Sequence, residues 1–423
     1  MFWYVRKLFL DLSKLKFHPV KKIFLVLSIS LVFLSCSKLV PGAPDASDTI
    51  AEPTEGLSLN QLSMFLEGDE LFAHVRTVEE GLGPIYIQSS CEGCHVGDGK
   101  GHPVNMVTRY GKLDNNIFSF MLNEGGPQIQ TRAIPGFSPE NFPSDATHFS
   151  DRVAPIVIGL GFLQSVHDSV LLNLADPLDA NMDGISGRVN YVLPTPYFIQ
   201  ESFHVDSSGY FIGRFGKKAK EVTIRDQVIF ALIQDLGLTT EFEMTDPIAY
   251  DIANNATDNV PDPEIGTDQV ERLTFYMKTL KAPTRRDEDD ADVIAGDALF
   301  NSVGCVKCHI QTLTTGESDI QALANKEFHP FTDLLIHDMG PALNDGLPEG
   351  SANGNEWRTA PLWGLGLAED SQGGTGFYLH DGRATSLGQA IGFHGGEATG
   401  VVSNYSALSK AEQDQLIKFL KSL

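Results

Sequence analysis

The chain has 423 residues, of which 42% are hydrophobic and 20% are charged. This apolar fraction supports packed cores and excludes a wholly disordered chain, and the length is typical of two or three domains. The formal net charge is −24, with 55 acidic residues against 31 lysines and arginines. A surface this acidic repels phosphate backbones, so we expect no nucleic-acid partner.

Residues 1–35 have the pattern of an export signal. A basic region precedes an apolar run over 23–34, which is too short for a membrane span of about 20 residues. Cys36 follows a Phe-Leu-Ser sequence that resembles the lipobox of bacterial lipoproteins, although phenylalanine stands where leucine is usual. We predict a lipoprotein signal peptide over 1–35, lipidation of Cys36 and a flexible tether over 36–56. The alternative is an ordinary signal peptide followed by an unmodified cysteine.

The other four cysteines fall into two Cys-x-x-Cys-His motifs. Their residues are Cys91, Cys94 and His95, and Cys305, Cys308 and His309. This motif is that of c-type haem attachment, in which two thiols bond one porphyrin and the adjacent histidine binds the iron. A zinc site or a redox-active cysteine pair would not explain why a histidine follows each second cysteine. We predict two covalently bound c-type haems.

A duplicated unit surrounds these motifs. Gly-Asp-x-Leu-Phe occurs at 68–72 and again at 296–300, on amphipathic stretches expected to be helices over 60–76 and 291–302. Each unit then closes with a similar helix, whose apolar stripe we expect to pack on the first helix of its unit. The second closing helix begins at a Ser409-x-x-Glu412 capping box.

These repeats predict a mainly α fold with two cytochrome c-type haem domains. The first would span 57–282 and the second 291–423, with an acidic linker between them. The first is far too long for a bare cytochrome c domain, so we expect residues 110–255 to be largely an insertion.

Longer blocks make the chain resemble the bacterial di-haem oxidoreductase family of peroxidases, also labelled thiol-oxidoreductase-like. The resemblance covers roughly 60–423, and its most specific motifs are Trp-Arg-Thr-Ala-Pro-Leu-Trp over 357–363 and Leu-His-Asp-Gly-Arg over 379–383. These are also similar to motifs of di-haem cytochrome c peroxidases and of the methylamine dehydrogenase maturation enzyme. The resemblance implies an electron-transfer haem in the second domain and a substrate haem in the first.

The resemblance also implies a sixth ligand for the electron-transfer haem. In the peroxidases this ligand follows the histidine of a His-x-Gly element by fourteen positions, which leads from His380 to His394 here. Met339 is the alternative, and we expect His380 to form structural hydrogen bonds. Arg358 and Arg383 are of the kind that pairs with haem propionates.

A glutamine and, ten positions later, a catalytic glutamate occur in the peroxidases, and Gln130 and Glu140 match that spacing. A carboxyl group near an open haem face could move the proton that peroxide cleavage requires. The alternative is a surface loop ending in a solvated glutamate. A second alignment places the catalytic loop on 154–156, where no carboxylate falls at the expected place and Gln164 stands near it instead. The family's Gly-Arg-Phe-Gly element often continues with tryptophan, where this chain has Lys217.

Asp179, Asn181 and Asp183 form a D-x-N-x-D-G pattern, which opens many calcium loops. The twelfth position is Asn190 instead of glutamate, so the loop is not a full EF-hand. The related peroxidases hold a calcium ion between their domains, which favours calcium here. The alternative is an acidic Asx-type turn.

We therefore expect an exported di-haem cytochrome that acts as a peroxidase-like oxidoreductase. Electrons would come from a donor protein or a quinone-linked donor, and peroxide or another small oxidant would be reduced. The protein would be anchored to a membrane by lipid and would face the periplasm or the cell exterior. The alternatives are a non-enzymatic electron carrier and an oxidase acting on a protein or thiol substrate.

Overall fold

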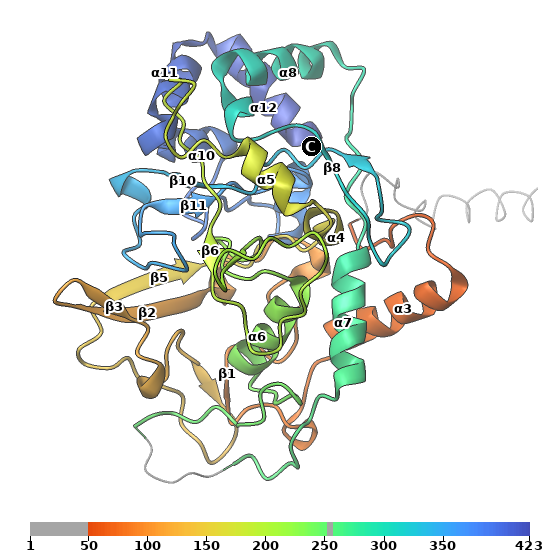
Figure 1. Cartoon of the computed structure of the whole chain (residues 1–423), viewed down its shortest axis with the longest axis vertical. Helices are drawn as coiled ribbons and strands as arrows, with labels where there is room; N and C mark the ends of the chain where they lie inside the picture. The colour runs from red at the N-terminus through yellow and green to blue at the C-terminus, as the bar shows by residue number, and fades with distance from the viewer. Residues whose placement is uncertain (1–49, 252–256) are drawn as a thin grey trace, which may run out of the picture. The chain divides into compact units, whose positions relative to one another are not determined.

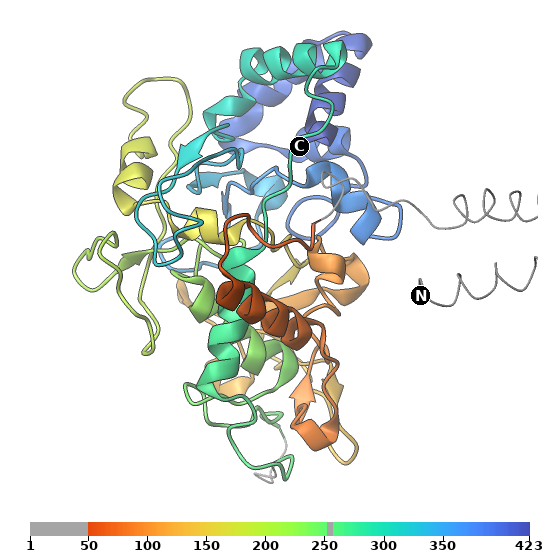
Figure 2. The ribbon, with the colours of Figure 1, turned by 90° about the vertical axis from the view of Figure 1, so that its right-hand side faces the viewer.

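The computed structural model describes residues 50–251 and 257–423, and two pairs of packed helices are prominent in this part of the chain (Figure 1). α3 (Leu59–Ala73) packs on α7 (Thr267–Thr279), and α8 (Ala291–Val303) packs on α12 (Lys410–Ser422). Figure 2 shows α3 crossing in front of α7. The predicted packing of a leading helix on a closing helix is confirmed in both repeats.

In each pair, the two helices approach each other closely at the glycine of the repeated Gly-Asp-x-Leu-Phe motif. A Cβ atom at Gly68 would lie 2.6 Å from Tyr276 Cβ, and one at Gly296 would lie 2.6 Å from Phe419 Cβ. Such distances are too short for any side chain, so only glycine allows the helices to approach this closely. The repeat in the sequence therefore corresponds to a repeated packing contact.

Side-chain caps begin three of these four helices. Ser409 and Glu412 form the predicted capping box of α12, and Ser58 forms an equivalent box with Gln61 at the start of α3. The side chain of Asp290 accepts hydrogen bonds from the first N–H groups of α8. These polar residues satisfy donors that a helix start leaves without partners.

Short helices and small antiparallel sheets fill the rest. The largest sheet has the order β3-β2-β5 and lies in the predicted insertion. Helices are the main regular structure of the described residues, in agreement with the predicted class. The remaining helices are α4 (Leu160–Gln164), α5 (Asp168–Leu174), α6 (Ile224–Leu236), α9 (Ala368–Ser371), α10 (Leu387–Phe393) and α11 (Thr399–Ala407). The strands are β1 (Ile85–Tyr86), β2 (Val107–Asp114), β3 (Ile117–Ser119), β4 (Arg132–Ala133), β5 (His148–Arg152), β6 (Tyr191–Val192), β7 (Phe211–Ile212), β8 (Leu313–Thr314), β9 (Glu327–Phe328), β10 (Ile336–Asp338) and β11 (Glu356–Arg358).

The parts of the chain before and after residue 282 share a core. The largest hydrophobic cluster surrounds α3, α6 and α7 and also contains Phe328, Leu335 and Trp363 from the later part. Buried ion pairs join the same parts: Glu349 lies 2.8 Å from Arg152 and 3.2 Å from Arg109. The predicted boundary between two haem domains stays a prediction, and the described residues on its two sides pack together.

The end of the predicted tether differs from expectation. The Thr54 N–H donates to Thr279 O at 2.7 Å, and Lys281 N–H donates to Glu52 O at 2.8 Å. These residues therefore pack on the end of α7 instead of forming a free tether. Cys36 and the predicted signal peptide lie outside the described residues.

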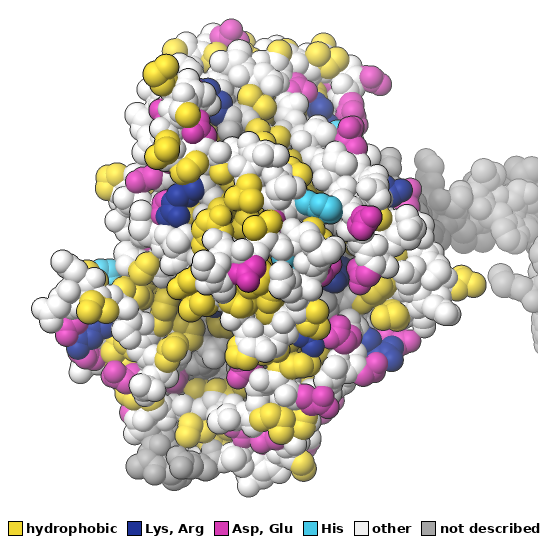
Figure 3. Space-filling model, viewed as in Figure 1, with side chains coloured by type: hydrophobic (Ala, Val, Ile, Leu, Met, Phe, Trp, Pro, Cys, Tyr) yellow, Lys and Arg dark blue, Asp and Glu magenta, His cyan; other side chains and the backbone are white. Residues whose placement is uncertain are grey.

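Charged side chains of both signs are spread over the face drawn in Figure 3, and hydrophobic side chains gather in its middle part. Several exposed apolar residues belong to the predicted insertion, among them Leu178, Met182 and Leu193. Of the helices that the structure describes, none has both the length and the apolarity needed to cross a bilayer.

Candidate haem-binding site

The first Cys-x-x-Cys-His segment forms one helical turn after α3. Cys91 O accepts hydrogen bonds from the N–H groups of Cys94 and His95, at 3.1 and 3.0 Å. The ring of Phe72, the last residue of the repeated motif, lies 6.1 Å from the His95 ring. The turn thus places both thiols and the imidazole on one short piece of backbone beside α3.

The second segment repeats this arrangement at the end of α8. Cys305 O accepts hydrogen bonds from Cys308 N and His309 N, at 3.4 and 3.0 Å. Phe300 is the equivalent aromatic residue, and its ring lies 6.4 Å from the His309 ring. Gly304 ends α8 with φ at 106°, a left-handed conformation that glycine adopts without strain, and so directs the chain into the turn.

One nitrogen of each motif histidine is held by a backbone carbonyl. His95 Nδ1 donates to Pro155 O at 2.8 Å, and His309 Nδ1 donates to Phe331 O at 2.9 Å. Burial lowers the pKa of each imidazole to about 4, so both rings are neutral at physiological pH. A neutral imidazole that donates through Nδ1 leaves Nε2 as a metal ligand with a set orientation.

The thiols also suit haem attachment. All four cysteines of the two motifs are free, and burial raises the pKa values of Cys91, Cys94 and Cys305 to about 12. They are therefore protonated and half-buried, beside a histidine whose Nε2 is available. Free thiol pairs and oriented imidazoles occur twice with the same geometry, so the residues fit two haems.

His394 is associated with the second turn. It follows α10, and its Nδ1 donates to Ala390 O at 2.7 Å, so its Nε2 is also left available. Burial is the main cause of the low pKa of His309, and His394 is close enough to lower that pKa electrostatically as well. The structure therefore brings the predicted sixth ligand near the second motif histidine. Its role as a ligand stays a prediction.

The first turn has a cationic neighbour instead. Lys217 lowers the pKa of His95 electrostatically, after the larger effect of burial. Burial places the pKa of Lys217 itself well below its usual value, and Lys100, Arg358 and Arg152 lower it further. This cluster of basic side chains is suited to the carboxylates of a haem or of another anion, which would favour the protonated form of Lys217. Arg383 instead donates to Asp381 Oδ2, at 2.6 Å.

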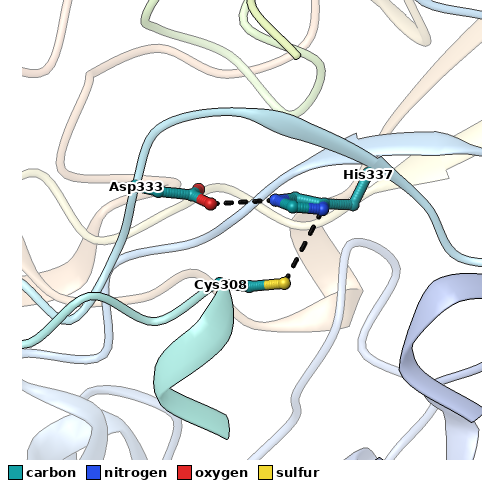
Figure 4. Close-up of side chains that lie close together, drawn as sticks. All are labelled: Cys308, Asp333 and His337. Carbon is teal, nitrogen blue, oxygen red and sulfur yellow. Dashed lines mark hydrogen bonds and ion pairs between the residues drawn. The ribbon is translucent and has the colours of Figure 1, made fainter. Parts of the chain in front are cut away.

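A buried ion group adjoins the second turn. Figure 4 shows His337 between Asp333 and Cys308, with Nε2 2.9 Å from the Asp333 carboxylate and Nδ1 3.6 Å from Cys308 Sγ. The Glu397 carboxylate also lies 2.9 Å from Nδ1. Burial alone would lower the pKa of His337, but these hydrogen bonds raise it to about 12. His337 is therefore an imidazolium ion beside the thiol that would bond the haem.

Charged residues on the paired strands β10 and β11 interact electrostatically with groups beside both turns. β10 and β11 pair His337 with Trp357, and the next residue, Arg358, is an electrostatic neighbour of both Asp333 and Lys217. His380 stacks on Trp357 with ring centroids 3.9 Å apart. Its Nε2 lies 3.7 Å from the Asp381 carboxylate, which is too far for a hydrogen bond, so the predicted hydrogen-bonding role of His380 stays a prediction.

A family model described as "Di-haem oxidoreductase, putative peroxidase" matches residues 140–423. The chain belongs to this family. Membership of a di-haem family implies two haems for each chain, which agrees with the two turns. No curated protein matches the sequence.

Three solved structures are similar to this di-haem oxidoreductase at low identity. Hydrazine synthase from Kuenenia stuttgartiensis is 15% identical over 91% of this chain and 97% of its own, with a TM-score of 0.37. The diheme peroxidase BthA from Burkholderia thailandensis is 13% identical over 90% and 89%, with a TM-score of 0.40. A MauG-like protein associated with microbial copper homeostasis is 14% identical over 69% and 94%, with a TM-score of 0.31.

Glu140 of this di-haem oxidoreductase is buried instead of solvated. It is 7% exposed, its Oε2 accepts a hydrogen bond from Gln130 N at 3.1 Å, and burial raises its pKa to about 7. The same segment continues to Arg132, which donates to Gln88 Oε1 beside the first turn. Gln130 and Glu140 therefore belong to one buried unit. Their catalytic role stays a prediction.

The second alignment of the catalytic loop conflicts with the geometry. Pro155 O accepts a hydrogen bond from His95 Nδ1, whereas Nε2, on the other side of the ring, is the nitrogen that would bind iron, so residues 154–156 would support the predicted proximal ligand. Gln164 is buried with both ends of its amide bonded: Nε2 donates to Glu201, and Oε1 accepts from Ile224 N. It is a satisfied core residue.

Asp235 is a candidate that the sequence analysis missed. It lies on α6, accepts a hydrogen bond from Gln128 Nε2 at 2.6 Å, and raises the pKa values of Cys91 and Cys94 electrostatically. Burial raises its own pKa to about 6. Its signal in the sequence is weak: a polar Gln-Asp pair follows the apolar run 228–233 near the end of α6.

The predicted calcium loop at Asp179 adopts Asx-type turns. Asp179 Oδ1 and Asn181 Oδ1 both accept from Asp183 N at 2.9 Å, and Asp183 Oδ2 lies 3.1 Å from Lys307 Nζ. Asn181 and Asp183 are exposed and Asp179 is half-buried, and N–H groups of their own loop and a lysine already occupy their oxygens. Calcium at this loop stays a prediction.

Proposed function

We propose that this di-haem oxidoreductase is a c-type cytochrome with peroxidase activity, in which the second haem receives electrons and the first meets the oxidant. Covalent attachment at both motifs is supported by the repeated turns, in which two thiols and one oriented imidazole share a backbone segment. The thioether bonds would form at Cys91 and Cys94, and at Cys305 and Cys308.

The difference between the two turns carries this proposal. A second imidazole with a free Nε2, His394, lies near His309, whereas the neighbour of His95 is the basic side chain of Lys217. A second strong ligand closes an iron to oxidants, and an open position admits them. We therefore assign electron transfer to the second site and the substrate to the first.

Haem iron, when bound, supplies the electrons that reduce the oxidant. The protein has to hold the haem and supply a proton. Glu140 is suited to the latter because its pKa of about 7 allows it both to accept and to donate a proton near neutral pH. Gln130 N–H holds Oε2, so Oε1 is the oxygen that would exchange the proton. Lys217 and Arg358 would attract haem propionates or an anionic substrate.

Export, the lipid anchor on Cys36 and delivery of electrons by a protein or quinone-linked donor are parts of the same proposal. They are supported by the N-terminal sequence pattern and by the need for an external electron source. Facing the periplasm or the cell exterior, the protein would meet peroxide outside the cytoplasm.

Absorption and electron paramagnetic resonance spectra of the purified protein test the proposal. We expect one low-spin haem and one haem with a high-spin component that responds to peroxide and cyanide. His394→Ala should convert the low-spin signal to high spin, whereas the matched change His329→Ala, at an exposed histidine, should leave both signals unchanged.

Two other results would overturn it. Two low-spin haems that are inert to peroxide would indicate an electron carrier. If the protein oxidised a protein or thiol substrate much faster than it reduced peroxide with an electron donor, it would be an oxidase. An unchanged low-spin signal in His394→Ala would reject that ligand.

A further inference from the structure

Four carboxylates gather between α6 and α7, away from both motif turns. They belong to Asp246, Asp258, Asp262 and Glu264. Oxygen atoms of three of them, Asp246, Asp262 and Glu264, all lie within 4.8 Å of one another. Asp258 adjoins Asp246, whose Oδ2 lies 3.4 Å from Asp258 N. The function proposed above uses none of these four residues.

One oxygen of each carboxylate is held by the protein. Asp258 Oδ1 accepts from Val260 N at 2.7 Å, and Asp246 Oδ2 faces Asp258 N. The buried residue Thr239, just after α6, holds the other two: its N–H donates to Glu264 Oε2 at 2.8 Å, and its hydroxyl lies 3.0 Å from Asp262 Oδ1. Hydrogen bonds of this kind orient carboxylates toward a shared ligand.

The second oxygens have no such partners. Asp246 Oδ1, Asp258 Oδ2 and Glu264 Oε1 are buried atoms without a hydrogen bond in the described part of the chain. Asp246 is only 7% exposed and Asp258 only 6%. Buried polar atoms are nearly always bonded, so three free carboxylate oxygens at one place indicate a missing partner.

The missing partner carries positive charge. Among residues 50–251 and 257–423, no lysine, arginine or histidine forms an ion pair with any of the four carboxylates. Burial raises the pKa values of Asp246 to about 6 and of Glu264 to about 7, and neighbouring aspartates raise that of Asp246 further. Grouped carboxylates repel one another and disfavour ionisation unless a cation is bound.

We propose that Asp246, Asp258, Asp262 and Glu264 bind a calcium ion. The donors are oxygens alone, which suits a hard cation and disfavours zinc or copper. Calcium accepts six to eight oxygens at about 2.3–2.6 Å in flexible geometry, whereas magnesium requires a tighter octahedron and retains several waters. Backbone carbonyls or water would complete the shell. This site is separate from the exposed loop at Asp179, whose oxygens are already bonded.

Bound calcium would join the end of α6 to the start of α7. Thr239 follows α6, and Glu264 precedes α7 by three residues. α6 carries Gln234, whose carbonyl accepts from Gln130 Nε2 at 3.0 Å, and α7 carries Tyr276, which packs on Phe72 beside the first turn. The ion would therefore stabilise the frame of the first site without contacting it.

Calcium binding to the full-length haem-loaded protein tests this inference. After treatment with EGTA, a calorimetric titration with calcium should show binding. Calcium should also raise the unfolding temperature by several degrees. Asp246→Asn combined with Glu264→Gln should reduce the calcium content by one ion per chain and abolish the thermal shift. An intact Soret band reports that the variant is folded.

Asp179→Asn combined with Asp183→Asn is the matched control, because it removes the same number of negative charges from a different acidic loop, which lies beside Lys307. It should keep the thermal shift. The single change Asp258→Asn provides a milder test if the double variant does not fold, and should weaken calcium binding at least tenfold. Wild type without calcium binding, loss of binding in the control alone, or equal binding of magnesium would each overturn the proposal.

Discussion

Gly68 on α3 lies so close to α7 that a Cβ atom added to Gly68 would be only 2.6 Å from Tyr276 Cβ. The same distance separates the corresponding atoms of Gly296 and Phe419, so the two helix pairs share one close contact. Tyr276 and Phe419 in turn pack on Phe72 and Phe300, with ring centroids 5.3 Å apart in both cases. Each glycine thus sets how near the closing helix comes to its attachment turn.

Gly68→Ala should therefore destabilise the protein by about 1–3 kcal/mol, because a methyl group forces packed helices apart. Chemical unfolding followed by far-ultraviolet circular dichroism measures the change. Gly400→Ala is the control, since nothing lies within 4 Å of a Cβ at that helical position. A loss of stability below about 0.5 kcal/mol in Gly68→Ala would show that α3 can shift freely on α7.

Replacement of the Glu349 carboxylate by an uncharged amide, in Glu349→Gln, should strongly destabilise the protein. The carboxylate lies 2.8 Å from Arg152 and 3.2 Å from Arg109, and its side chain is 1% exposed. Removing its charge leaves the buried Arg109 guanidinium without an ion-pair partner in the described part of the chain and leaves Arg152 with Asp345 alone, which costs about 3–5 kcal/mol. Glu369→Gln, on an exposed pair with Lys421, should change stability by less than about 1 kcal/mol.

The same carboxylate predicts a loss of stability in acid. Burial alone would raise the pKa of Glu349, but Arg109 and Arg152 lower it to about 2, below the value of about 4.5 in an unfolded chain. Its contribution is therefore complete above pH 4.5 and is lost as pH falls toward 2. Unfolding free energies measured across this range should fall less steeply in Glu349→Gln.

His337 predicts the opposite dependence at high pH. Hydrogen bonds to Asp333 and Glu397 outweigh burial and raise its pKa to about 12, above the unfolded value of 6.5. Its contribution is complete below pH 6.5 and is lost as pH rises toward 12. Unfolding measured between pH 7 and 10 should show this decline in wild type. His337→Gln should flatten it, and an unchanged slope would mean that the imidazole is neutral.

Glu140→Gln should lower peroxide turnover by about 10²–10⁴-fold, because the amide cannot accept a proton. With a pKa of about 7, the wild-type carboxylate should give kcat/KM values that rise with pH through 7. Steady-state assays with an artificial electron donor measure both effects. Glu70→Gln, at an exposed position on α3, should retain wild-type turnover and pH profile. A variant at Glu140 with normal kinetics would move the proton transfer to another group, with Asp235 the next candidate.

Much of the haem chemistry was predictable because it depends on residues close together in the chain. The Cys-x-x-Cys-His spacing predicts one helical turn, and the structure has such a turn at both Cys91 and Cys305. The Gly-Asp-x-Leu-Phe repeat and the Ser409 capping box likewise predicted which helices form and how they pair. Periodicity and capping are local properties, so a single sequence displays them.

Partners far apart in the chain were decided by tertiary structure. Pro155 and Phe331, which hold the motif histidines through backbone carbonyls, carry no side-chain signal for this role. Glu140 was compatible with a solvated loop until its burial became visible, and Lys217 could not be assigned to either haem. The carboxylates of Asp246 and Glu264 look like ordinary loop acids in the sequence. Only folding removes water from their oxygens and brings them together, and this desolvation is the basis of the cation site proposed for them.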